Sequence, residues 1–281
     1  MRYLDPKNQF TFKKLFAEHP HLLISFLNSV LPLDEGQKIE TIEYLPADMV
    51  RPTPLFKSSI VDVRCKDNFG RQFIVEMLML WTDAFKSRVL FNASKAYIKQ
   101  LEKGEAWDTI QPVYALSLVN QNFDHQSDSY YHHFKIVTVD EPKLFLDGLE
   151  FVFIELPKVK ARNLKEKALG VLWLRFLAEI ENRAEQISPD FFEVPELMEA
   201  TEILKESAFT ETELASYDKY WDTAMVEKAL LQGAKMEGIE EEKFETIYSA
   251  FAQGLSIEII SKITRLSVEE VSKALRARNL N

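Results

Sequence analysis

The segment SSIVDVRCKDNFGRQFIVEMLML, residues 58–80, places two acidic residues in runs of mostly apolar side chains. A turn sequence, Asn68-Phe69-Gly70, separates the runs, and glycine in the left-handed conformation is common in three-residue hairpin loops. If these three residues form the loop, Asp62 lies opposite Glu76. Directly opposed residues have Cβ atoms roughly 4.5–5.5 Å apart. The segment therefore predicts a β-hairpin that brings two carboxylates together.

The alternation of side chains along a strand divides this hairpin into two faces. Asp62, Glu76 and Leu78 share one face, and the residues of the other face are apolar: Val61, Val63, Val75 and Met77. Two facing carboxylates in apolar surroundings do not both ionise without a shared proton, a basic neighbour or a divalent cation. Mg²⁺ favours one or two carboxylates together with waters and a substrate phosphate. The pattern is therefore that of a metal-dependent phosphodiesterase.

A structural explanation of the two acids stays open at this point. Asp62 would then pair with Lys57 or Arg64, and Glu76 would cap another element or face solvent. A slip of one residue in the pairing would also send the acids to opposite faces of the sheet. The register of the hairpin decides between these alternatives.

The overall composition is that of an acidic globular protein. The chain has 281 residues, a formal net charge of −10 and a pI of about 5.2, so contact with nucleic acid requires a local basic patch. The single cysteine, Cys65, excludes an intrachain disulfide framework and a cysteine-based zinc site. No apolar run reaches the roughly 20 residues that span a bilayer. We expect a cytoplasmic protein without membrane contact.

Periodicity divides the chain into an α/β part and a helical part. For residues 1–160 we expect a mixed α+β sheet, with helices over 9–31 and 83–103 and strands over 38–46, 58–66, 71–80, 112–119, 133–140 and 149–157. Residues 161–235 are predicted to form a helical region and residues 236–281 a helical tail. The predicted helices cover 164–182, 189–206, 211–232 and 238–253, with a softer boundary at the two glycines of QGAKMEG (232–238).

Several blocks of the sequence resemble a known family in their order and spacing. They are YLDPKNQFTFKKLF (3–16), KSSIVDV (57–63), FIVEM (73–77), FKSRVLFNASKAYIKQLEKG (85–104), QPVYALSLVN (111–120), FIELPKV (153–159) and AFAQGLSIEIISKITRLSVEEVSKAL (250–275). Together they resemble the PD-(D/E)XK nuclease superfamily, and more narrowly its transposases, also called recombination-promoting nucleases. The resemblance covers most of the chain and implies a restriction-endonuclease-like core.

The resemblance also implies a metal site. Asp62 and Glu76 would bind Mg²⁺ or Mn²⁺, with the backbone carbonyl of Met77 as a third ligand. The family pattern has an acid at the position of Gln9 and a lysine or glutamine at the position of Leu78, and this sequence departs from it at both. Gln9 adds no negative charge, and Leu78 cannot orient a water or stabilise developing charge.

Other basic residues could supply the missing group. Lys57 lies just upstream of Asp62. The helix predicted over 83–103 carries a polar stripe at helical spacing: Arg88, Asn92, Lys95 and Lys99. We predict Arg88 as the first phosphate contact and Lys95 as the second; the alternative is that the stripe is the solvated face of the helix.

Histidines and one further acid–base pair suggest structural roles. His132 and His133 are adjacent in a predicted strand, so they point to opposite faces and do not share one ion. Glu155 and Lys158 also match the family pattern, and we expect them to close a strand end.

The C-terminal segment GLSIEIISKITRLSVEEVSKAL, residues 254–275, resembles a helix-turn-helix. Its second helix would present Lys273 and Arg276 to DNA. The alternative is a helical hairpin used for packing or dimer contacts, which the acids Glu258, Glu269 and Glu270 favour.

These observations lead to a first functional hypothesis and two alternatives. The first is a Mg²⁺-dependent DNA endonuclease for transposition or recombination in a bacterial mobile element, with Lys57 or Arg88 stabilising the phosphate. The second is a degenerate relative that binds DNA or a protein partner without cutting, which Gln9 and Leu78 favour. The third is a helical oligomerisation module, with a homo-oligomer formed through the C-terminal region.

Overall fold

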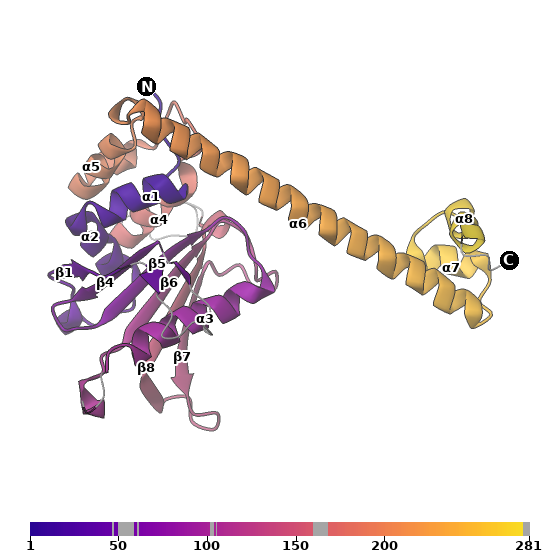
Figure 1. Ribbon diagram of the computed structural model, residues 1–281, viewed down its shortest axis with the longest axis horizontal. Helices are drawn as coiled ribbons and strands as arrows, with labels where there is room; N and C mark the ends of the chain where they lie inside the picture. The colour runs from indigo at the N-terminus through magenta and orange to yellow at the C-terminus, as the bar shows by residue number, and fades with distance from the viewer. Residues whose placement is uncertain are drawn as a thin grey trace. The chain divides into compact units, whose positions relative to one another are not determined.

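A six-stranded mixed sheet forms the centre of the N-terminal part (Figure 1). The computed structural model describes residues 1–46, 48–49, 59–60, 62–101, 104, 106–159 and 168–277. The sheet has the order β1-β4-β5-β6-β8-β7, with β5, β6 and β8 parallel and the other strands antiparallel to their neighbours. Its strands are β1 (Ile42–Tyr44), β4 (Val63–Asp67), β5 (Gln72–Leu78), β6 (Val113–Val119), β7 (Tyr131–Val137) and β8 (Phe145–Glu155). Two short strands, β2 (Asp48–Met49) and β3 (Ser59–Ile60), pair separately.

The β4–β5 hairpin has the register that the sequence predicts. Val63 pairs with Val75 and Lys66 with Gln72, and Gly70 has a φ of +81° in the connecting turn. This φ favours glycine because it lies in the left-handed region. Continuing the same pairing by one residue puts Asp62 opposite Glu76.

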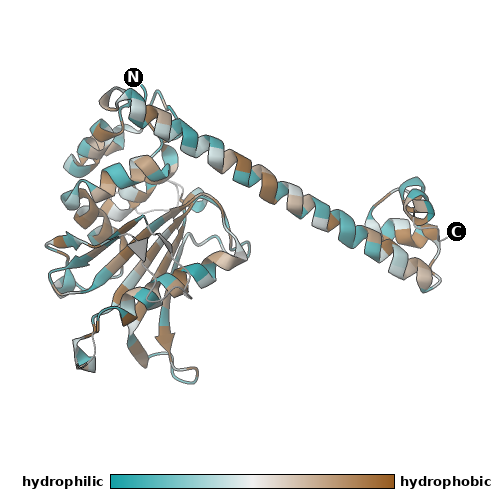
Figure 2. Ribbon diagram, in the orientation of Figure 1, coloured by the Kyte–Doolittle hydropathy of each residue, from teal (hydrophilic) through white to brown (hydrophobic). Residues whose placement is uncertain are grey.

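Helices cover both faces of the sheet. The face that carries Val63 and Val75 packs against α1, α2, α4 and α5, whereas the face that carries Ile74 and Leu78 packs against α3. The helices are α1 (Gln9–Ala17), α2 (Pro20–Val30), α3 (Asp83–Ile98), α4 (Leu169–Glu179) and α5 (Pro195–Ile203). Because both faces are covered, the parallel strands β5, β6 and β8 are mostly apolar, as Figure 2 shows for the centre of the sheet, and the buried acid Glu76 in β5 is an exception. The predicted α/β fold class is confirmed.

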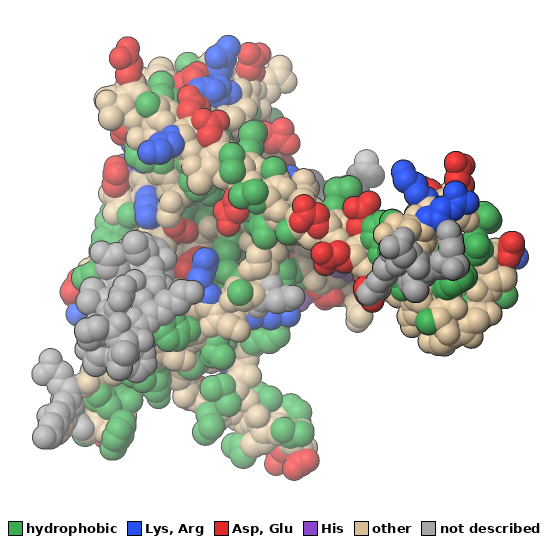
Figure 3. All heavy atoms as spheres, turned by 45° about the vertical axis from the view of Figure 1, so that its right-hand side comes forward, with side chains coloured by type: hydrophobic (Ala, Val, Ile, Leu, Met, Phe, Trp, Pro, Cys, Tyr) green, Lys and Arg blue, Asp and Glu red, His purple; other side chains and the backbone are tan. Residues whose placement is uncertain are grey.

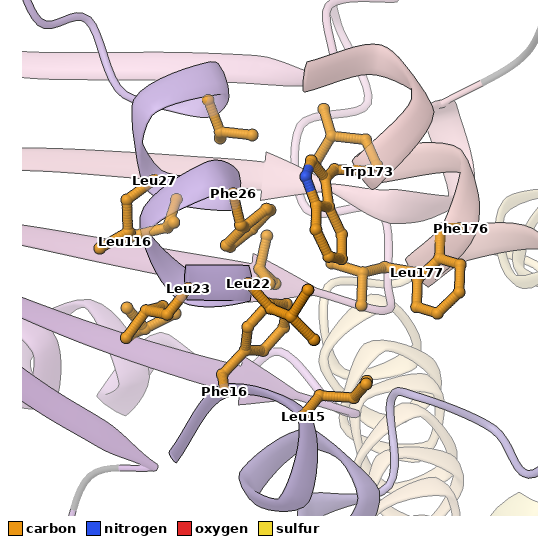
Figure 4. Packing of buried hydrophobic residues seen from close by; sticks show 14 of the residues in the cluster. Leu15, Phe16, Leu22, Leu23, Phe26, Leu27, Leu116, Trp173, Phe176 and Leu177 are labelled. Atoms are coloured by element: carbon orange, nitrogen blue, oxygen red, sulfur yellow. The ribbon is translucent and has the colours of Figure 1, made fainter. Parts of the chain in front are cut away.

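The larger core contains a cluster of aromatic rings between α1, α2 and α4 (Figure 4). Phe16 lies 5.0 Å from Phe26 and 5.7 Å from Trp173, measured between ring centroids. A Cβ atom added to Gly170 of α4 would lie 2.3 Å from the carbonyl oxygen of Ser29, so the backbones of α2 and α4 approach closely there. This packing anchors α1, the helix that carries Gln9, against the sheet.

The chain divides into two compact units, Met1–Trp221 and Asp222–Asn281. Helix α6 (Glu211–Ala252) runs without interruption past Gly233 and Gly238, so the predicted break between 232 and 238 is wrong. A glycine in a helix costs only about 1 kcal/mol relative to alanine, and the surrounding residues are good helix formers. In the second unit, α7 (Ile257–Thr264) and α8 (Val268–Ala277) pack on the end of α6 around Ile247 and Ile260.

Candidate active site

The hairpin brings the two acids together at the edge of the α3 face. Asp62 directly precedes β4, and its Oδ2 accepts a 2.7 Å hydrogen bond from the backbone N–H of Met77. Glu76 lies in the second half of β5 and is only 4% exposed. The pairing of Val63 with Val75 excludes the one-residue slip that would send the acids to opposite faces.

Helix α3 supplies the neighbours of Glu76. Phe85 and Val89 pack on the sheet and so orient the helix. On its flank, Asn92 donates from Nδ2 to Oε1 of Glu76 at 3.2 Å, and Nη2 of Arg88 lies 4.0 Å from Oε2. The guanidinium of Arg88 also lies over the Phe85 ring and is half exposed. Arg88 is thus both near the carboxylate pair and open to a ligand.

Helix α1 supplies the neighbours of Asp62. Nε2 of Gln9 donates a 2.9 Å hydrogen bond to Oδ1 of Asp62. Asn8 caps the helix by accepting from the N–H of Phe10, which fixes the first turn where Gln9 lies. Lys13 is one turn further along, and its positive charge is among the influences that lower the pKa of Asp62. Sequence reasoning missed Lys13, although the i, i+4 spacing from Gln9 was a usable signal.

Burial raises the pKa of both carboxyl groups above their ordinary values. The pKa of Glu76 is raised to about 7, mainly by burial; Arg88 and Asn92 oppose the rise, and the nearby charge of Asp62 contributes to it. Burial also raises the pKa of Asp62, and the hydrogen bonds from Met77 and Gln9 oppose that shift. Such a pair gains from a cation that neutralises both groups.

The donor set fits a hard divalent cation. In the part of the chain that the structure describes, no cluster of three or more His, Cys, Asp or Glu residues could hold a metal. Two carboxylates suffice for Mg²⁺, however, which keeps several waters and uses substrate phosphate as a ligand. Asp62 and Glu76 provide those carboxylates. The carbonyl of Met77 as third ligand stays a prediction.

The sequence model of the PD-(D/E)XK nuclease family transposases matches residues 6–234. The chain belongs to the PD-(D/E)XK nuclease family transposases. The family predicted from the sequence motifs is therefore confirmed, and nucleases of this class generally use divalent metals. Searches of curated proteins and of solved structures gave no match.

The two positions at which the sequence differs from the pattern that the resemblance implies are both described by the structure. Gln9 reaches the site and contacts Asp62. Leu78 is buried in the α3-side core with Ile74 and Phe85, so it brings no polar group to the acids. Among the described neighbours of the two acids, the positively charged side chains are instead Arg88 and Lys13.

The remaining predicted site residues differ in how they lie. Lys57 is outside the described residues. On α3, Asn92 and Lys95 are buried and Arg88 is exposed, so the alternative of a wholly solvated stripe is wrong. Nζ of Lys95 lies 5.1 Å from the centroid of the Phe91 ring. A contact between Lys95 and DNA stays a prediction.

His132, His133 and Glu155 lie outside this site. His132 contacts Glu155 at 2.7 Å and His133 contacts Glu150 at 2.6 Å, so the two histidines do point in opposite directions. Nζ of Lys158 lies 2.8 Å from Glu155, and the same amine donates to the carbonyl of Asp124. This network closes the end of β8, as the sequence predicts.

The C-terminal tail lies beyond the family match. Ser267 and Glu270 form a capping box at the start of α8, with reciprocal hydrogen bonds. Lys273 and Arg276 are exposed on α8, and their contact with DNA stays a prediction. Among the described residues, no helix is long and apolar enough to cross a membrane.

Proposed function

We propose that the protein hydrolyses DNA phosphodiester bonds with a divalent cation, Mg²⁺ or Mn²⁺, held by Asp62 and Glu76. The observation that carries the proposal is the convergence of these two carboxylates from β4 and β5, with Glu76 buried and its pKa raised to about 7. When bound, the cation supplies an acidified water and charge stabilisation at the phosphate.

The surrounding side chains have separate tasks in this proposal. Gln9 and Asn92 hold the two carboxylates in place by hydrogen bonds, so the pair does not have to reorganise when it binds the cation. Arg88 and Lys13 stabilise the phosphate, because both carry positive charge next to the acids and neither is fully buried. Together they replace the lysine or glutamine that is expected at the position of Leu78.

The second candidate is a relative that binds DNA or a protein partner without cutting. It is favoured by Leu78, because this buried apolar side chain supplies no polar group to the site from the strand of Glu76. It also follows from Gln9, which offers a neutral amide where the family has an acid. In this case the carboxylate pair would be a vestige of the fold.

A plasmid nicking assay separates the two candidates. Supercoiled DNA is incubated with the full chain in Mg²⁺ or Mn²⁺, and wild type is compared with Asp62→Asn. The matched control is Asp128→Asn, an exposed acid in the loop before β7. Nicking by wild type and the control, lost by at least roughly 100-fold in Asp62→Asn, supports the nuclease. Equal nicking by all three proteins, or none at any metal concentration, would show that the site does not cut.

The setting proposed for this activity is bacterial DNA transposition or recombination in the cytoplasm. A homo-oligomer is proposed through α6, where Met225, Ala229, Met236 and Ile239 are exposed at heptad spacing. Light scattering measures the solution mass. A monomeric mass at micromolar concentration would reject the oligomer.

A further inference from the structure

An apolar groove lies on the same face of the sheet as the acids, between α3 and strands β7 and β8. Its volume is about 300 Å³, and we call it the aromatic groove. Its lining includes one leucine, Leu90, and six further residues: Trp81, Lys86, Phe123, Phe134, Phe151 and Phe153. Phe134 and Leu90 are each about half exposed, so the groove is open to solvent.

The wall of the aromatic groove formed by Trp81 and Phe123 is held by ring packing and hydrogen bonds. The rings of Trp81 and Phe123 stack at 4.1 Å with an angle of 17° between their planes. The backbone N–H of Trp81 donates to Oε1 of Gln121, and the backbone N–H of Phe123 donates to Oε2 of the buried Glu155. The network of Glu155, His132 and Lys158 therefore orients a wall of the groove. Such a groove is formed before any ligand binds.

The chemistry of the lining favours a planar ligand that accompanies negative charge. Five of the seven lining residues are aromatic, and none of the residues lining the groove is acidic. Among the described residues that line the groove, Lys86 alone is charged, and its Nζ lies 5.5 Å from the centroid of the Trp81 ring. Aromatic side chains beside a cation are the usual means of binding unpaired nucleic-acid bases and their phosphates. A purely aliphatic peptide ligand would not explain this composition.

The position of the aromatic groove connects it with the carboxylate pair. Trp81 follows Glu76 by five residues, which limits the chain between them to at most roughly 18 Å. Strand β8, which provides Phe151 and Phe153, lies two strands from β5, or roughly 10 Å across the sheet. Helix α3 packs on β6 and β8 between the two places, and carries Arg88 on one flank and Lys86 on the other. One DNA strand can therefore contact both sites.

We propose that the aromatic groove binds an unpaired nucleobase of a DNA strand whose phosphate lies at Asp62 and Glu76. The substrate class is then DNA with single-stranded or unpaired nucleotides next to the cleaved bond. The inference rests on the proposed function for the position of the strand, although binding in the groove does not require cutting. A volume of about 300 Å³ is at the small end of ligand pockets, which suits a single base.

The test measures binding without cleavage. Fluorescence anisotropy follows a labelled 12-nucleotide single strand and its duplex in Ca²⁺, with the full chain as wild type, Phe134→Ala, Trp81→Leu and Lys86→Ala. The control is Leu146→Ala, an exposed apolar residue of β8 outside the groove. Wild type is expected to bind the single strand at least about tenfold more tightly than the duplex. The two aromatic variants are expected to lose roughly 5- to 100-fold in affinity for the single strand, with the control unchanged.

Several results would overturn the inference. Equal binding of single strand and duplex would do so, as would groove variants that bind the single strand like wild type. A wild-type dimer in sedimentation that Phe134→Ala converts to a monomer would assign the groove to a protein partner instead. Melting temperatures within a few degrees of wild type check that the variants are folded. Phe134→Ala is expected to disturb folding least, because the Phe134 ring is about half exposed.

Failure of the groove and failure of the nuclease proposal are distinguishable. If wild type binds the single strand but does not nick DNA in Mg²⁺, and Phe134→Ala loses that binding, the groove proposal is supported and the cutting proposal is rejected. If wild type nicks DNA and Phe134→Ala binds normally, the cutting proposal stands and the groove falls.

Discussion

Gln9 and Asp62 are joined by a 2.9 Å hydrogen bond from Nε2 to Oδ1, across 53 positions of sequence. The bond places a neutral amide where the PD-(D/E)XK family pattern has an acid. The site therefore has two carboxylates, each held by a neutral amide, Gln9 on Asp62 and Asn92 on Glu76. A third carboxylate in place of Gln9 would add negative charge and change the affinity for a metal ion.

Replacing Gln9 by glutamate is expected to strengthen metal binding about tenfold, because affinity for hard cations rises with the number of charged ligands. Without metal, the new carboxylate repels Asp62 and lowers stability by about 1 kcal/mol. Calorimetric titration with Mn²⁺ at pH 8 measures the affinity. Gln126→Glu, on an exposed loop, controls for the change in net charge; an equal gain in this variant would disprove the role of Gln9.

The raised pKa of Glu76 predicts that stability depends on pH. The folded protein holds this proton more tightly than the unfolded chain, since burial moves the pKa from 4.5 to about 7. Between these values stability falls as the pH rises, and the whole loss, about 3 kcal/mol, is present above pH 7. In EDTA, Glu76→Gln is therefore expected to show a smaller drop in melting temperature from pH 5 to pH 8 than wild type.

Metal binding should show the opposite pH dependence. Mg²⁺ requires the ionised carboxylate, so the melting temperature gained on adding Mg²⁺ is expected to grow as the pH rises through 7. The same gain should be absent in Glu76→Gln. A gain that is equal at pH 6 and pH 8 would contradict the assignment of Glu76 as a metal ligand.

Local sequence patterns predicted the β4–β5 hairpin, but they did not predict contacts between residues far apart in the sequence. The turn at Gly70 and the alternation around it were sufficient to predict the pairing of β4 with β5. The same local patterns did not predict the parallel order of β5, β6 and β8, because parallel strands are joined by crossovers whose geometry depends on contacts between residues far apart in the sequence. Helical spacing places Lys13 on the same face of α1 as Gln9, but it does not indicate that this face meets Asp62, and the signal from the spacing was therefore not used.

The aromatic groove also lay beyond local patterns. Trp81, Phe123 and Phe134 come from three separate segments of the chain, and each reads as an ordinary apolar residue in its own segment. Only the packing of α3 on the sheet brings them together. The break predicted in α6 failed for the reverse reason, since glycine was given more weight than its roughly 1 kcal/mol cost justifies.

Two helical glycines test the close packing of α2 and α4. Gly170→Ala should lower stability by at least about 2 kcal/mol, because the new Cβ would meet the carbonyl oxygen of Ser29 at 2.3 Å. Gly233→Ala should raise it by about 0.5–1 kcal/mol, since no atom lies within 4 Å and alanine favours the helix. Urea unfolding measures both, and equal effects of the two changes would contradict the packing.

Neighbouring lysines on α1 test which cation serves the site. Lys14 lies 2.7 Å from Glu213 and over the Phe209 ring, so Lys14→Ala should cost about 1 kcal/mol of stability and leave DNA cutting unchanged. The positive charge of Lys13 acts on Asp62, so Lys13→Ala should reduce the rate of DNA cutting roughly tenfold and change the free energy of unfolding by no more than about 0.5 kcal/mol. Because Lys13 lowers the pKa of Asp62, its loss should also move the acid limb of the pH–rate profile upward. Nicking rates measured from pH 5 to pH 9 test both effects. A pH–rate profile that shifts in Lys14→Ala and not in Lys13→Ala would contradict the role of Lys13.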